Sequence, residues 1–233
     1  MQADLEIVVK HEVPLIITSL GAVSELIQSV HGYGGLVFHD VIMKRLAQKA
    51  AAAGIDGLTL VSAGAGGHAG TINPIALVGE IRSFFDKTIL LAGCISTGQD
   101  VAAALQMGAD LAYTGTRFIN TTESEALPEY KQMIIESSAS DVIYTAAISG
   151  VPANFLRPSL EQMGITEEMW EKTVDVDFGN ELIANDEAKA WKTIWSAGQG
   201  ITKIGDSPKT SILVARLRKE FKIAIEIQSK LLA

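Results

Sequence analysis

The fold of this chain is decided by two similar segments, KAAAAGIDGLTL at residues 49–60 and ALQMGADLAYT at residues 104–114. Each contains an alanine-rich helical stretch, a glycine where the helix ends, an aspartate in the turn, and then an apolar strand. This repetition, with apolar strands hidden beneath helices, predicts either a (β/α) barrel or a doubly wound parallel sheet.

Five short apolar runs are the strand candidates, and amphipathic helical stretches separate them. The spacing between them fits strand, loop, helix and return turn, and therefore a parallel sheet. An eight-stranded barrel needs ~250 residues and eight such units, so a barrel built from these five would lack three. The candidates are Leu15–Ser19, Leu36–His39, Leu58–Ser62, Ile89–Ala92 and Leu111–Thr114.

The third unit is longer than the others by roughly nine residues, about the size of a functional loop. The extra length falls in LTLVSAGAGGHAG at residues 58–70, where a strand runs into a loop of glycines and alanines. Such a loop can lie close against a flat cofactor or an anion, and His68 is its only group that can move a proton near neutral pH. The alternative is an ordinary flexible turn with a solvated histidine.

Two glycine-ended strands follow this loop, in ILLAGCISTG at residues 89–98 and LAYTGTRF at residues 111–118. Gly93 and Gly115 end their strands, and exposed backbone amides at such turns can bind a phosphate. Ser96 is the expected N-cap of the next helix, with Gln99 completing a capping box. Either glycine alone could be an ordinary turn residue, but the pair beside the His68 loop favours a phosphate site.

Two charged or titratable residues near these segments leave alternatives open. Arg117 could pair with a phosphate or serve as a surface ion-pair residue. His39 could face the same mouth as His68 or act as a structural hydrogen-bond donor.

Composition narrows the class of protein. The 233 residues are 48% hydrophobic and carry a net charge of −8, which argues against nucleic acid as a partner. No apolar run is long enough for a membrane span, and the first residues do not have the pattern of a signal peptide. The single cysteine, Cys94, excludes an internal disulfide and provides no metal cluster. A cytoplasmic, soluble protein is expected.

The character of the chain changes after residue 120. A helix is expected over residues 124–138, an irregular segment over residues 141–158, and a long final helix over residues 211–232. We therefore expect a partial barrel at residues 1–122, a small helical subdomain with substrate-side loops at residues 123–205, and a C-terminal helix that returns to the barrel at residues 206–233.

At these residues the sequence resembles the nitronate monooxygenase family, formerly called 2-nitropropane dioxygenases. The matching segments are AGAGGHAG at 63–70, the whole of 89–118, YTAAISGVPANFLR at 144–157 and WSAGQG at 195–200. The resemblance implies an FMN-dependent TIM barrel that oxidises alkyl nitronates with O₂ to a carbonyl compound and nitrite. Its partners would be a nitronate or nitroalkane and O₂, and homo-oligomer formation is left open.

The resemblance also assigns roles to individual residues. His68 would be the catalytic base beside the flavin, and Gly66 and Gly67 would contact FMN. Residues at the two turns would hold the phosphate end of the cofactor: Gly93, Cys94, Tyr113, Thr114, Gly115 and Thr116.

The sequence departs from the family at two positions and at its start. Cys94 replaces a second glycine found in many relatives, and Val61 replaces a glutamine that contacts the flavin in some. Residues 15–19 correspond to the fourth barrel strand, so the first three strands have no counterpart and the chain matches the C-terminal part of the family. Two other functions therefore stay open: a flavin-dependent enoyl reductase that uses NAD(P)H, and a non-catalytic fragment that binds no flavin.

Overall fold

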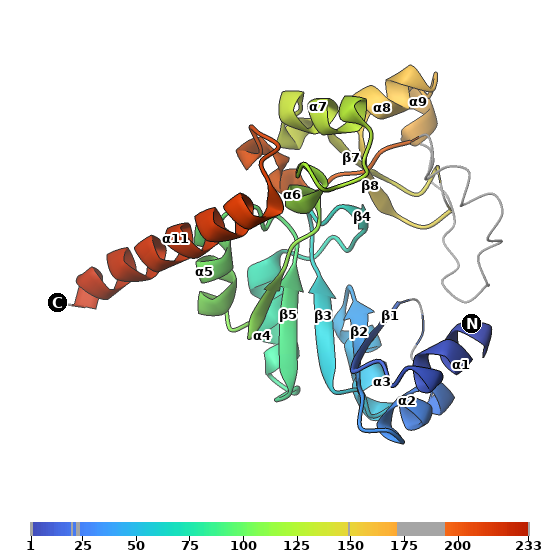
Figure 1. Ribbon diagram of the computed structural model, residues 1–233. Coiled ribbons are helices and arrows are strands. Elements are labelled where there is room, and N and C mark those ends of the chain that lie inside the picture. Colours follow the sequence, from blue (N-terminus) through green and yellow to red (C-terminus); the bar gives the residue numbers. More distant parts are fainter. Residues whose placement is uncertain (1, 20, 22–23, 149, 172–193, 233) are drawn as a thin grey trace.

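A sheet of five parallel strands forms the centre of the protein (Figure 1). The computed structural model describes residues 2–19, 21, 24–148, 150–171 and 194–232. The strand order is β1-β2-β3-β5-β6, without the reversal that marks a doubly wound sheet. This order selects the barrel from the two predicted architectures. The strands are β1 (Leu15–Thr18), β2 (Leu36–Val41), β3 (Gly57–Val61), β5 (Thr88–Ala92) and β6 (Leu111–Tyr113).

One helix connects each strand to the next parallel strand, as the spacing predicts. These connecting helices are α2 (Ser24–His31), α3 (Lys44–Ala52), α4 (Pro74–Arg82) and α5 (Gly98–Gln106), and α1 (Gln2–Lys10) precedes β1. All five predicted strands are confirmed, with ends that differ by no more than two residues.

The two faces of the sheet have different surroundings. Side chains alternate along each strand, and Val37, Val41, Leu58, Leu60 and Leu91 belong to a core cluster that also contains residues of the connecting helices. The alternate residues face the inner, concave side. At the two edges of the sheet this inner face is partly open, because these apolar side chains are more than one-third exposed: Leu15, Ile17, Leu36, Leu111 and Tyr113.

The aspartates of the two repeated segments have the same structural role. The Asp56 carboxylate accepts a hydrogen bond from the Val37 amide at 2.8 Å, and the Asp110 carboxylate accepts one from the Ile89 amide at 2.8 Å. Each aspartate thereby links the turn before its own strand to the start of the neighbouring strand. Burial acts to raise the pKa of Asp110, but hydrogen bonds from Arg82 and Ile89 outweigh it and hold that pKa below its usual range.

A second, antiparallel sheet lies beyond the carboxyl ends of the parallel strands (Figure 1). Its order is β4-β8-β7, with β4 (Gly67–His68) contributed by the loop after β3. The segment 141–158, expected to be irregular, instead contains β7 and β8. The remaining elements here are β7 (Val142–Thr145), β8 (Ala153–Leu156), α6 (Thr116–Ile119), α7 (Pro128–Glu136), α8 (Arg157–Gln162), α9 (Glu167–Trp170) and the 3₁₀ helices Ala139–Asp141 and Gln199–Lys203.

The last helix, α11 (Thr210–Ser229), packs against α5 and then extends beyond the sheet to a short 3₁₀ turn, Lys230–Leu232 (Figure 1). The contact is close, because Glu220 of α11 accepts a hydrogen bond from the Gly98 amide at 2.8 Å. A side chain at Gly98 would collide with the α11 backbone at Leu217 and Phe221. Among the residues that the structure describes, no helix combines the length and apolar character that crossing a bilayer requires.

Candidate functional site

A cavity of about 340 Å³ opens at the carboxyl ends of β3, β5 and β6. This volume lies within the range of small-molecule sites, ~300–1,000 Å³. It brings together eight of the nine predicted site residues: Gly66, Gly67, His68, Gly93, Cys94, Tyr113, Gly115 and Thr116. The ninth, Thr114, lies between two of them in sequence, and its hydroxyl donates to the Ile95 carbonyl at 2.6 Å.

The His68 loop is held in place by a segment distant in sequence. β4 pairs with β8 so that His68 lies opposite Ala153 and Gly67 opposite Asn154. The Asn154 side-chain amide donates to the Ala65 carbonyl at 2.6 Å. The loop is therefore fixed at the cavity rather than free, and His68 is half-buried.

Asn154 was not singled out from the sequence as a functional residue. Its only signal there was its position inside the family-like segment 144–157. Its role depends on a contact across 89 residues of chain, which no local pattern reveals.

The segment around Gly198 forms another wall of the cavity. The Gly198 amide donates to the Thr116 hydroxyl at 3.0 Å, and the Gln199 amide donates to the Gly64 carbonyl at 2.9 Å. A Cβ placed on Gly66 would lie 2.8 Å from the Gly198 nitrogen and 3.1 Å from the Thr116 hydroxyl. Gly66 is therefore required by the close packing of two loops.

The turn after β5 has an unusual backbone. Gly93 has φ +124° and Cys94 has φ +59°, in the left-handed region that favours glycine. This conformation accounts for the glycine that many family members place at position 94. Burial, with the negative charge of Asp100, raises the pKa of the Cys94 thiol, so Cys94 is a protonated thiol at neutral pH rather than a thiolate nucleophile.

The N-terminus of α5 differs from the prediction. Thr97, not Ser96, is the N-cap, and Asp100, not Gln99, completes the capping box. The Asp100 carboxylate accepts hydrogen bonds from the amides of Ser96 at 3.0 Å and Thr97 at 2.9 Å. The Thr97 hydroxyl accepts the hydrogen bond of a free amide in the first turn, as a serine would. The Asp100 side chain, shorter than that of a glutamine, reaches the amides of both Ser96 and Thr97.

Free backbone donors lie at the loop and at the two strand-ending turns. Among the described residues, the amides of Gly66, Cys94 and Gly115 donate to no protein acceptor. These three residues line the same cavity. Backbone amides at tight turns are good anion donors, so this set fits the phosphate of a cofactor.

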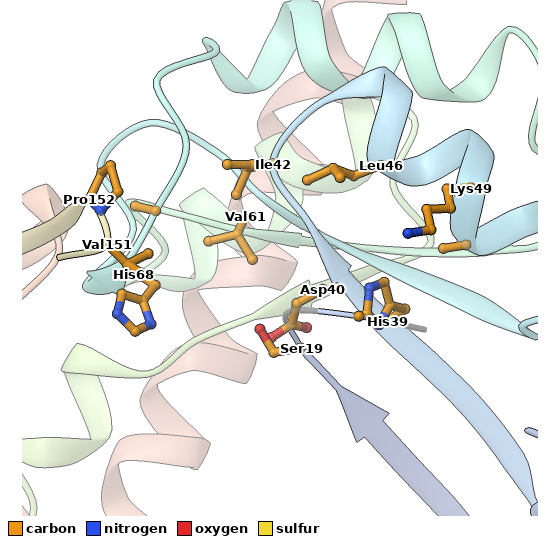
Figure 2. A pocket seen from close by; sticks show the side chains of 13 residues that line it. Ser19, His39, Asp40, Ile42, Leu46, Lys49, Val61, His68, Val151 and Pro152 are labelled. Atoms are coloured by element: carbon orange, nitrogen blue, oxygen red, sulfur yellow. The ribbon is translucent and has the colours of Figure 1, made fainter. Parts of the chain in front are cut away.

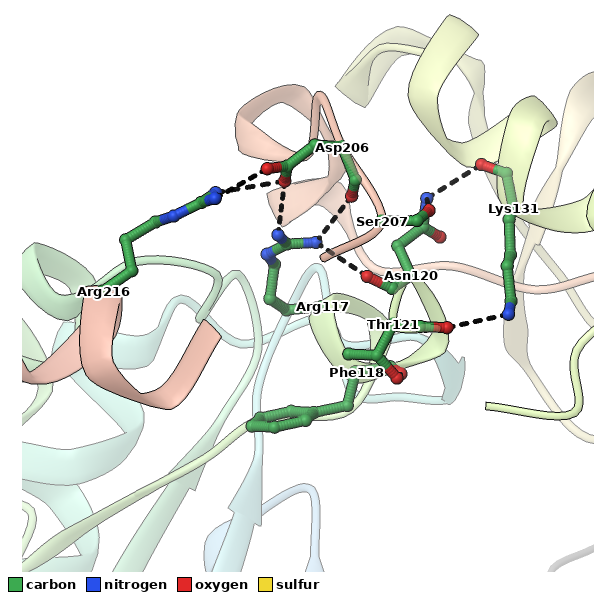
Figure 3. A network of polar contacts seen from close by, with 8 residues as sticks. All are labelled: Arg117, Phe118, Asn120, Thr121, Lys131, Asp206, Ser207 and Arg216. Carbon is green, nitrogen blue, oxygen red and sulfur yellow. Dashed lines mark hydrogen bonds and ion pairs between the residues drawn. The ribbon is translucent and has the colours of Figure 1, made fainter. Parts of the chain in front are cut away.

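Arg117 does not belong to this donor set (Figure 3). Its guanidinium is 2% exposed and donates to the Asp206 carboxylate at 2.7 Å and to the Asp206 carbonyl at 3.1 Å. Arg216 of α11 binds the same carboxylate at 2.7 Å. Of the two interpretations of Arg117, the ion pair is confirmed, although it is buried rather than on the surface, and it links α6 to α11.

A second cavity, of about 350 Å³, adjoins the first. Figure 2 shows the residues that line it. Asp40, Val61 and His68 line both cavities. The rest of the second cavity combines apolar side chains of Ile42, Leu46, Val151 and Pro152 with the polar side chains of Ser19, His39 and Lys49. His68 therefore lies between the cavity with the amide donors and a space suited to a small apolar group.

His39 lines the second cavity and is also a structural residue. Its Nδ1 lies 2.7 Å from the Thr18 hydroxyl, which itself donates to the Phe38 carbonyl at 3.2 Å. Burial, and secondly the charge of Lys49, lower the pKa of His39, so the ring is neutral near pH 7.

The chain is similar to known proteins along most of its length. A model of the nitronate monooxygenase family matches residues 1–220. A nitronate monooxygenase from Paraburkholderia phytofirmans is 32% identical over 190 residues, which are 75% of this chain and 51% of that protein. One from Neurospora crassa is 32% identical over 124 residues, 49% of this chain and 32% of that protein. The chain thus spans about half, or less, of the length of these two relatives.

Two solved structures share the fold. A nitroalkane oxidase from Streptomyces ansochromogenes has a TM-score of 0.79 at 26% identity, covering 97% of this chain and 69% of that one. FabK from Thermotoga maritima has a TM-score of 0.79 at 24% identity, covering 97% of this chain and 74% of that one.

Proposed function

The chain belongs to the nitronate monooxygenase family, and we propose that it is an FMN-dependent oxidoreductase. The proposed reaction is the oxidation of alkyl nitronates with O₂ to a carbonyl compound and nitrite. One observation carries this proposal: His68, the glycine loop and the two strand-ending turns line a single cavity at the carboxyl ends of parallel strands. In barrel enzymes this end carries the active site.

The cofactor assignment rests on the backbone. The turns at Gly93–Cys94 and Thr114–Thr116 would hold the phosphate, through the free amides of Cys94 and Gly115. Gly67 would let a flat ring approach the loop closely, because a side chain there would enter open space, and Gly66 would contact the cofactor through its free amide. Tyr113 also lines this cavity. Bound FMN would supply the electron-transfer chemistry, and the protein would supply position and charge.

His68 is the proposed proton-handling group. Its neutral imidazole would accept the α-proton of a nitroalkane, and its protonated form would donate a hydrogen bond to a nitronate oxygen. The β4–β8 pairing keeps the ring at the boundary between the two cavities. The apolar side chains of the second cavity would contact the alkyl group.

Two measurements on the purified chain test this proposal. The first is an absorbance spectrum with and without added FMN, in which a retained flavin band after desalting is expected. The second is nitrite release from ethyl nitronate in air, which should require the bound flavin. A chain that stays colourless after incubation with FMN would overturn the proposal and favour a fragment that binds no flavin.

The sequence resemblance leaves open the alternative of a flavin-dependent enoyl reductase that uses NAD(P)H. Anaerobic mixing of the FMN-loaded protein with NAD(P)H distinguishes the two functions. Slow or absent flavin bleaching is expected for a nitronate monooxygenase. Rapid bleaching together with no nitrite release would instead support the reductase.

A further inference from the structure

Asp40 is a half-buried carboxylate with one oxygen that the fold leaves unpaired. It lies on β2 and faces the inner side of the sheet, beside Thr59 of β3. Its Oδ1 is fully buried and has no hydrogen-bond partner within the part of the chain that the structure describes. In contrast, Asp56, Asp100 and Asp110 each accept two or more hydrogen bonds.

Burying an unpaired carboxylate oxygen is unfavourable. Burial raises the pKa of Asp40, and the nearby Thr59 hydroxyl only partly offsets this effect. A buried polar group without a partner in a folded protein calls for an explanation. A ligand donor is one such explanation, because Asp40 lines both cavities.

The position of Asp40 suits the ring of a bound cofactor. The first cavity runs from the turns at Gly93 and Gly115, past Val61, to Asp40 at its other end. A ring whose phosphate is held at those turns would extend towards Asp40. The anionic group of a nitronate would be repelled by the carboxylate, so the ring is the better partner.

We propose that Asp40 is a flavin-binding residue that lowers the reduction potential of the cofactor. Its carboxylate accepts a hydrogen bond from a ring N–H of bound FMN, and its charge disfavours the reduced, more negative ring. This inference rests on the proposed function, because it requires FMN in the first cavity.

The test compares the midpoint potential of bound FMN in the wild type and in Asp40→Asn, measured against a redox dye under anaerobic conditions. Removing the charge should favour binding of reduced over oxidised FMN at least about tenfold. This ratio corresponds to a rise of 29.6 mV in the midpoint potential of a two-electron couple. Asp40→Glu keeps the charge, so its affinity ratio should stay within about twofold of the wild type by the same conversion. Asp86→Asn, an exposed carboxylate outside both cavities, should leave the potential unchanged.

The outcomes distinguish a failure of the Asp40 inference from a failure of the proposed FMN binding. Equal potentials in wild type and Asp40→Asn would overturn the inference, even if the variant melts at a different temperature. If Asp40→Asn does not fold, Asp40→Ala gives the same comparison. Failure of the wild type itself to bind FMN would overturn the proposed function, and with it this inference.

Discussion

Replacing Gly66 with alanine is expected to destabilise the protein, because two loops meet at this glycine. The new Cβ would lie 2.8 Å from the Gly198 nitrogen, 3.0 Å from the Ala197 carbonyl carbon and 3.1 Å from the Thr116 hydroxyl. Two of these neighbours are backbone atoms, so they cannot move aside as a flexible side chain can. Overpacking costs about 1–3 kcal/mol, and we expect the upper half of that range.

For a chain of this size, a loss of about 2–3 kcal/mol lowers the melting temperature by roughly 4–12 °C. Circular dichroism at 222 nm during heating measures this change, and the FMN affinity should fall as the Gly66 loop shifts. Gly79, inside α4, is the matched control, because its Cβ would meet nothing within 4 Å. Gly79→Ala should raise the stability by about 0.5–1 kcal/mol. Equal melting temperatures for Gly66→Ala and the wild type would refute the argument that the loops are tightly packed.

Three further predictions address the base, the ion pair and the turn. His68→Asn should retain FMN but release nitrite from nitroethane about 100-fold more slowly or worse; an unchanged rate would remove His68 from the chemistry. Asp206→Ala should lower the free energy of unfolding in urea by about 3 kcal/mol, because it leaves the Arg117 guanidinium buried and unpaired; a change of a few tenths would show that the carbonyl contacts suffice. The pKa of Asp110 is lower in the folded than in the unfolded chain, so its ionised form stabilises the fold above the unfolded pKa of about 3.9. This stabilisation is lost as pH falls through the folded pKa. The stability difference between wild type and Asp110→Asn should therefore shrink below about pH 4, and a constant difference would contradict this role.

The parallel sheet could be predicted from the sequence because each unit carries its own local signals. The glycine that ends a helix, the aspartate in the following turn and the apolar strand lie within a dozen residues in both repeated segments. The structure gives Asp56 and Asp110 the same hydrogen bonds, so the sequence similarity has a structural cause. The positions of Gly66, Gly93 and Gly115 in one cavity also follow, since the carboxyl ends of parallel strands meet at one edge.

Contacts between distant segments could not be predicted in this way. β7 and β8 have four residues each, too few for a clear alternation, and the pairing of β8 with β4 depends on the His68 loop. The hydrogen bond from Asn154 to Ala65 and the ion pair between Arg117 and Asp206 each join segments more than eighty residues apart. The N-cap of α5 was misplaced by one residue because serine and threonine are both good caps.

In the proposed function, one cavity holds FMN between the strand-ending turns and His68. A crystal structure of the chain grown with FMN tests it most directly. We expect the phosphate within hydrogen-bond distance of the Cys94 and Gly115 amides and the ring beside the His68 imidazole. A phosphate bound elsewhere, or a ring that lies away from His68, would contradict it.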